Sequence, residues 1–86
     1  MFRIWGRMIK DNRLIKDITV TREDDTRTHR VFGAIDQICH EWNLGRPIWL
    51  DSNVAEFKKH AKTRFGKDSF IEEIDFDYLE IRVLEE

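Results

Sequence analysis

The sequence predicts an α+β fold, a single domain over residues 1–86 with the element order β-β-α-α-β. Two observations carry this prediction. Three segments alternate apolar and polar side chains with the period of a strand, and two segments between the second and third repeat apolar residues at helical spacing. Because strands are grouped apart from helices, we expect an antiparallel or mixed three-stranded sheet with two helices packed on one face. The opposite face is then open to solvent or to a partner.

Residues 2–9 and 14–21 predict two strands joined as a hairpin. A two-residue loop would set Met8 opposite Ile15 and would mix core-facing and solvent-facing side chains. A three-residue loop with Asn12 in the left-handed conformation removes this conflict. The pairs that it predicts are Met8 with Leu14, Ile4 with Ile18 and Phe2 with Val20, all facing the core.

Two helices are expected between the hairpin and the last strand. The first follows Thr26, a favourable N-cap residue, and has apolar residues at helical spacing over 31–42. The second begins at Asn53, with Glu56 three residues later as in a capping box. Its narrow apolar stripe continues to Gly66, where we expect the helix to end.

An extended linker and a third strand complete the predicted fold. Residues 46–50 contain a proline, which excludes a helix, and we expect Ile48 or Trp49 to fill one end of the core. Residues 69–76 match neither period for long enough to be assigned. Residues 78–83 alternate cleanly and predict the third strand, with one buried face.

Composition narrows the class of protein. Fifteen Lys and Arg against 17 Asp and Glu give a net charge of -2, so no overall basic excess indicates nucleic acid and any electrostatic argument is local. The single cysteine, Cys39, lies in the predicted buried stripe of the first helix, which favours a reducing compartment. No segment is long and apolar enough for a membrane span. We therefore expect a cytoplasmic protein without a membrane partner.

Catalytic and metal-binding patterns are absent from the sequence. The candidate metal ligands are His29, Cys39, His40 and His60, but Cys39 and His40 point about 100° apart on one helix. The chain has no glycine-rich phosphate loop and no nucleophile elbow, and its neighbouring carboxylates lack a context that would make them an acid and base pair. We expect a protein that is not an enzyme and holds no metal or cofactor.

Five short segments carry a resemblance to known proteins. They are Pro47–Leu50, Phe57, Lys62–Phe65, Phe70–Glu72 and Asp75–Glu80. With these segments the chain resembles a group of short bacterial proteins of clostridial type, over most of its length. The resemblance implies a bacterial, cytoplasmic origin, and it carries over no activity, cofactor or site residue.

The open sheet face is the first candidate binding surface. Its predicted contact residues are Arg3, Trp5, Arg7, Ile15, Tyr78 and Arg82. Arginine and aromatic side chains are typical of interface hot spots and also of platforms for single-stranded RNA, but Asp17 and Glu80 on the same face favour a protein partner. We expect a non-catalytic protein-interaction module, either an adaptor, a regulator or a homodimer, that uses this face around Trp5. The alternative is that Arg and Glu pairs across strands simply cover Trp5.

The second candidate surface is basic. Its cations are Lys58, Lys59, Lys62, Arg64 and Lys67, expected on the outer face of the second helix. Such a face can follow a phosphate backbone, so nucleic-acid binding is the alternative function; a solvated face that complements the helix dipole is the other interpretation. If Trp5 and these cations share one surface, nucleic-acid binding gains support. If they lie on opposite sides, a protein partner gains support.

Overall fold

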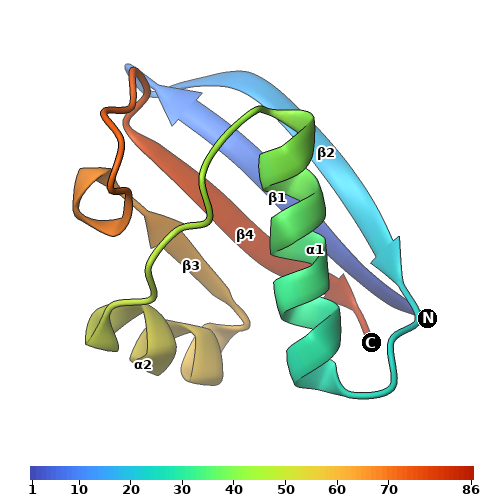
Figure 1. The fold of residues 1–86 in the computed structure, drawn as a ribbon. Coiled ribbons are helices and arrows are strands. Elements are labelled where there is room, and N and C mark those ends of the chain that lie inside the picture. The colour runs from blue at the N-terminus through green and yellow to red at the C-terminus, as the bar shows by residue number, and fades with distance from the viewer.

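The computed structural model describes residues 1–86 and contains two α-helices and one antiparallel sheet (Figure 1). The elements are β1 (Phe2–Lys10), β2 (Arg13–Arg22), α1 (Arg27–Glu41), α2 (Asp51–His60), β3 (Lys62–Phe65), the short 3-10 helix η1 (Lys67–Ser69) and β4 (Tyr78–Glu85). Figure 1 shows α1 over β1 and β2 and α2 beside β3, both on the same side of the sheet. The predicted α+β class is confirmed, but the sheet has four strands in the order β2-β1-β4-β3, not three.

The additional strand, β3, lies where the sequence predicts the end of the second helix. That helix is expected to reach Gly66, but α2 ends just before Ala61, which adopts a left-handed backbone with φ 55°. The chain then turns and pairs β3 with β4. The prediction is wrong because Phe57, Ala61 and Phe65 are spaced four apart, so their apolar side chains fit a helical stripe as well as a turn followed by a strand.

The hairpin turn contains two residues, not three. Asp11 and Asn12 have φ values of 52° and 63°, the backbone of a type I′ turn, which matches the twist of the flanking strands. The Asp11 backbone N–H donates to Asp77 Oδ2 at 2.9 Å, which ties the turn to the segment before β4.

A β-bulge in β2 resolves the conflict that this short turn would otherwise create. Ile9 pairs with Leu14 and Met8 with Lys16, so Ile15 is the extra residue. Leu14 therefore lies on the open face, and Ile15 lies on the helix side, where it lines a hollow together with Met8. This exchange is the reverse of the prediction. The observed pairs are Ile4 with Val20 and Gly6 with Ile18, in place of the predicted Ile4 with Ile18, Phe2 with Val20 and Met8 with Leu14.

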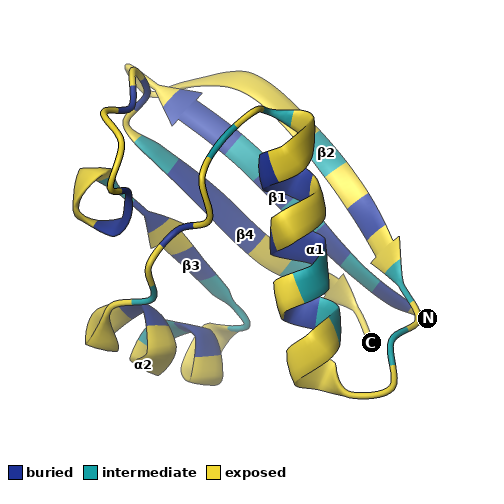
Figure 2. Cartoon of the chain, in the orientation of Figure 1, coloured by how far each residue is buried: buried dark blue, intermediate teal, exposed yellow.

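The core lies between the sheet and the helices and is a cluster of 16 buried residues drawn from all four strands, both helices and the loop before β4 (Figure 2). In the linker, Trp49 packs edge-on against Phe57 and Phe65, with ring centroids 5.3 and 5.1 Å apart. A Cβ at Gly6 would lie 2.7 Å from Ile38 Cδ1, so this glycine lets α1 approach β1 closely.

Each helix is fixed at its start by a polar side chain. Thr26 Oγ1 accepts a hydrogen bond from the His29 N–H at 3.1 Å, as the predicted N-cap requires. Asn53 is not the N-cap of α2, which is Leu50; its Oδ1 instead accepts from the Leu50 N–H at 3.0 Å. The buried Asn53 Nδ2 donates to Thr63 Oγ1 at 2.8 Å and so joins α2 to β3.

The bulged register predicts unequal costs for two truncations in the hairpin. Ile4→Ala should lower the free energy of unfolding by about 2 to 5 kcal/mol, because Ile4 is 0% exposed and its removal leaves a cavity. Leu14→Ala should cost under about 1 kcal/mol, because Leu14 is 50% exposed. Denaturation in urea measures both values. Equal large losses would mean that Leu14 faces the core and that the bulge is misplaced.

Candidate functional site

The sheet face turned away from the helices is called the open face below. Since Phe2, Ile4 and Met8 point into the core, the residues between them point to the other side. The strand register places these residues there: Arg3, Trp5, Arg7 and Ile9 from β1, Leu14, Asp17 and Thr19 from β2, Lys62 and Arg64 from β3, and Tyr78, Glu80 and Arg82 from β4.

The predicted contact residues divide between this face and other parts of the molecule. Five of the six lie on the open face, and the sixth, Ile15, is carried to the helix side by the bulge. The predicted basic helix face does not exist as one surface, because its residues occupy three elements. Lys58 and Lys59 lie on α2, Lys62 and Arg64 on β3, and Lys67 in η1.

Glu80 is the centre of the open face. It is only 3% exposed, although it projects from the side of the sheet that no helix covers. Arg7 of β1 and Arg64 of β3 lie directly opposite it on the two neighbouring strands. Arg64 Nε donates to Glu80 Oε2 at 3.0 Å, and an Arg7 terminal nitrogen donates to Oε1. Each carboxylate oxygen therefore has its own guanidinium.

The ion pairs decide the charge of this buried carboxyl. Burial alone would raise the pKa of Glu80, but the hydrogen bonds from Arg7 and Arg64 outweigh it and hold the pKa below its ordinary value of 4.5. The hydrogen bond to Glu80 also raises the pKa of Arg64. Glu80 and Arg64 are thus charged at neutral pH.

Two aromatic rings flank the ion pairs. The Arg7 guanidinium carbon lies 4.5 Å from the ring centroid of Trp5, and that of Arg64 lies 4.7 Å from the ring of Tyr78. Trp5 Nε1 donates to Asp17 Oδ2 at 2.8 Å. The resulting array, called the Arg–Glu–Arg array below, crosses all four strands from Asp17 through Trp5, Arg7, Glu80 and Arg64 to Tyr78. Trp5 is partly buried by these contacts and not fully exposed.

Two further cations on the open face, Lys62 and Arg82, have no bonded counterion, although Glu56 of α2 lines the same hollow as Lys62. They are directly opposite each other on β3 and β4, and neither forms an ion pair. Like charges at opposed positions of a sheet repel each other. This corner of the open face therefore carries two cations side by side.

The remaining reactive side chains do not form a site. Burial raises the pKa of the Cys39 thiol to about 11, which leaves it protonated and unreactive. His29 of α1 contacts Asp25, which lies just before the helix, with Nδ1 and Oδ1 2.8 Å apart. No group of three or more His, Cys, Asp or Glu side chains gathers in an arrangement that could hold a metal ion.

The sequence interpretation missed the contribution of β3 to the open face. Lys62 and Arg64 alternate with Thr63 and Phe65, which is a strand pattern with a β-branched and an aromatic residue on the inner side. That signal is only four residues long, and the helical spacing of the preceding segment hides it.

No family model, curated protein or solved structure matches this chain. The resemblance to short clostridial-type proteins therefore stays a prediction. Neither helix combines the length and the apolar character that crossing a membrane requires.

The Arg–Glu–Arg array predicts a pH-dependent stability. Folding lowers the pKa of Glu80, so ionised Glu80 adds to the free energy of unfolding. This stabilisation is complete above pH 4.5 and is lost as the pH falls through the lower pKa of the folded state. At pH 7, Glu80→Gln should be about 1 to 4 kcal/mol less stable than the wild type, because two guanidinium groups lose their counterion.

Chemical denaturation of both proteins between pH 7 and pH 3 measures this difference. It should shrink below pH 4.5. A difference that stays constant over the whole range would show that Glu80 is not held ionised by the two arginines.

Proposed function

We propose that the protein is a non-catalytic protein-interaction module that binds its partner through the open face around Trp5. The observation that carries the proposal is the Arg–Glu–Arg array. Trp, Tyr and Arg dominate the binding energy of protein interfaces, and the array contains all three types. Its side chains are already fixed in the free protein by hydrogen bonds and ring contacts, which reduces the entropy lost on binding.

The charges of the open face support a protein partner. The exposed carboxylates Asp17 and Glu85 lie among the five cations of this face, and Glu85 Oε2 is 3.9 Å from a terminal nitrogen of Arg3. Carboxylates on the contact surface repel phosphates but pair with Lys and Arg of another chain. The partner is either a second copy of this chain or another protein, and the uncompensated Lys62 and Arg82 call for an acidic side chain on it.

Nucleic acid is the second candidate, and one observation favours it. Lys62 and Arg64 lie on the same face as Trp5, so aromatic and positive surface coincide there. Against this, Arg7 and Arg64 already share Glu80, while Lys58 and Lys59 belong to a helix on the other side of the sheet. Only a short phosphate contact is left, so we rank this function second.

Trp5→Ala tests the leading proposal. A Trp at the centre of an interface supplies a large share of the binding energy, so association should weaken by at least about 30-fold, the equivalent of about 2 kcal/mol. Self-association is measured first, by sedimentation over a range of concentrations, because a homodimer needs no unknown partner. Capture of binding proteins from the native cell follows, with the folded state of the variant verified by circular dichroism.

The matched control is Thr19→Ala, which truncates the residue directly opposite Trp5 on β2 but leaves the Arg–Glu–Arg array intact. Its effect on association should be much smaller. The proposal fails if the chain stays monomeric at high concentration and Trp5→Ala leaves the capture of every native partner unchanged.

The second candidate has its own test in fluorescence anisotropy with single-stranded RNA and DNA at low salt. Binding through the open face should weaken steeply as salt is added, and should drop when Lys62 and Arg82 are both changed to Gln. The double variant Lys58→Gln and Lys59→Gln is the control, because these residues lie on α2. Absence of binding at low salt would remove nucleic acid from consideration.

A further inference from the structure

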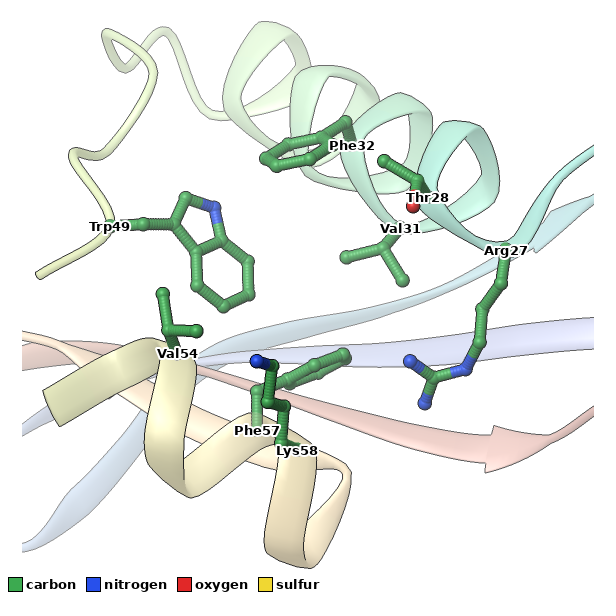
Figure 3. Close-up of a pocket in the computed structure, with 8 residues that line it drawn as sticks. All are labelled: Arg27, Thr28, Val31, Phe32, Trp49, Val54, Phe57 and Lys58. Atoms are coloured by element: carbon green, nitrogen blue, oxygen red, sulfur yellow. The ribbon is translucent and has the colours of Figure 1, made fainter. Parts of the chain in front are cut away.

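A second surface feature lies on the helix side of the sheet, away from the open face. It is a groove of about 320 Å³ between α1 and α2 (Figure 3). Its apolar lining consists of Val31 and Phe32 from α1, Trp49 from the linker, and Val54 and Phe57 from α2. Both Phe32 and Val54 are large apolar side chains left in contact with solvent, 41% and 39% exposed.

The groove is a preformed feature of the fold. α1 is anchored on β1 and β2 and α2 on β3, so the two helices are held apart over different strands (Figure 1). Trp49 lies between them, with its ring centroid 5.8 Å from that of Phe32 and 5.3 Å from that of Phe57. Since Phe57 belongs to the buried cluster, the lining of the groove is continuous with the core.

The charged residues that line the groove are both positive. Arg27 and Lys58 are its only charged lining residues, although the chain as a whole has more carboxylates than cations. Figure 3 shows their side chains coming from opposite helices, with Lys58 beside Phe57. Lys58 forms no ion pair. Arg27 Nε donates to Glu86 Oε1 at 2.7 Å, which leaves the two terminal nitrogens of Arg27 free. An anionic group placed here would find donors on Lys58 and on the terminal nitrogens of Arg27, and the Glu86 carboxylate is the one negative group bonded to them.

We propose that this groove binds a medium-chain aliphatic monocarboxylate. The groove has a volume of about 320 Å³, and a group of the size of a water molecule fills about 30 Å³. The groove therefore accommodates about ten such groups, which corresponds to a chain of about ten carbons. The alkyl chain lies against Phe32, Trp49 and Val54, where it covers apolar surface that water otherwise contacts. The carboxylate lies between Lys58 and Arg27, in the manner of other small-molecule sites with a few polar groups at one end.

Titration with decanoate, below the concentration at which it forms micelles, tests the site. In the variant Trp5→Phe and Trp42→Phe, Trp49 is the only tryptophan and reports directly on the groove. Decanoate should change its fluorescence in a saturable way, and octanoate should bind more weakly by about two- to fourfold for each methylene removed. Decyltrimethylammonium, with the same chain and the opposite charge, should bind at least about tenfold more weakly than decanoate.

Two neighbouring lysines provide a matched pair of variants. Lys58→Gln should weaken decanoate binding by about three- to tenfold and leave the affinity for neutral decanol unchanged. Lys59→Gln, on the next residue of the same helix, should change neither, because Lys59 does not line the groove. Phe32→Ala should weaken decanoate and decanol alike, since it removes apolar contact area from both.

Three outcomes would overturn the proposal. These are no saturable change at Trp49, equal affinities for the acid and the quaternary ammonium compound, or equal effects of the two lysine variants. If a second copy of the chain covers the groove instead, it excludes decanoate and the first outcome appears. The test is independent of the open face, because Trp5 is already replaced in the reporter variant.

Discussion

The burial of Glu80 between Arg7 and Arg64 is the constraint on which the arrangement of the sheet depends. Burying an unpaired carboxylate that is only 3% exposed would destabilise the folded state strongly, so this sheet is stable only if both arginines contact Glu80. They do so only if β4 lies between β1 and β3 and if Glu80 is opposite both. If β4 shifted by one residue against β1 or β3, Glu80 would lose a counterion and Leu79 would turn out of the core. Register and strand order are thus enforced by charge on one face and by packing on the other.

The same constraint separates the two proposed binding sites. The ion pairs hold the strands together on the open face, and the helices are attached to different strands on the opposite face. Since α1 packs on β1 and β2 while α2 packs on β3, the apolar surface between the helices is covered only by Trp49. A rigid four-stranded sheet then lies between the groove and the open face. A protein on one side and a small carboxylate on the other would not compete for space.

The parts of the fold that could be predicted are those with a long, regular pattern. The alternation in β1, β2 and β4 and the helical spacing in α1 identify these elements and, apart from Leu14 and Ile15, the side of the sheet that each strand residue occupies. Two features could not be predicted. The bulge at Ile15 shifts the pairing of β1 and β2 by one residue, and the residue types of the two strands do not indicate it. The left-handed backbone at Ala61 is rare for a residue with a Cβ, so the end of α2 there could not be expected. The bonds of the Arg–Glu–Arg array depend on strand order, which local periodicity does not contain.

The open face is electrically uneven, and this unevenness restricts how a partner can lie on it. At the β2 side Asp17 is bonded to Trp5, and at the centre Glu80 neutralises two arginines in part. At the β3 side Lys62 and Arg82 stand opposite each other without a counterion. A partner that presents an apolar or aromatic surface to Trp5 and a carboxylate to Lys62 and Arg82 satisfies both ends. The reversed orientation would bring that carboxylate next to Asp17 and leave the two cations unpaired, so the charge distribution selects one orientation.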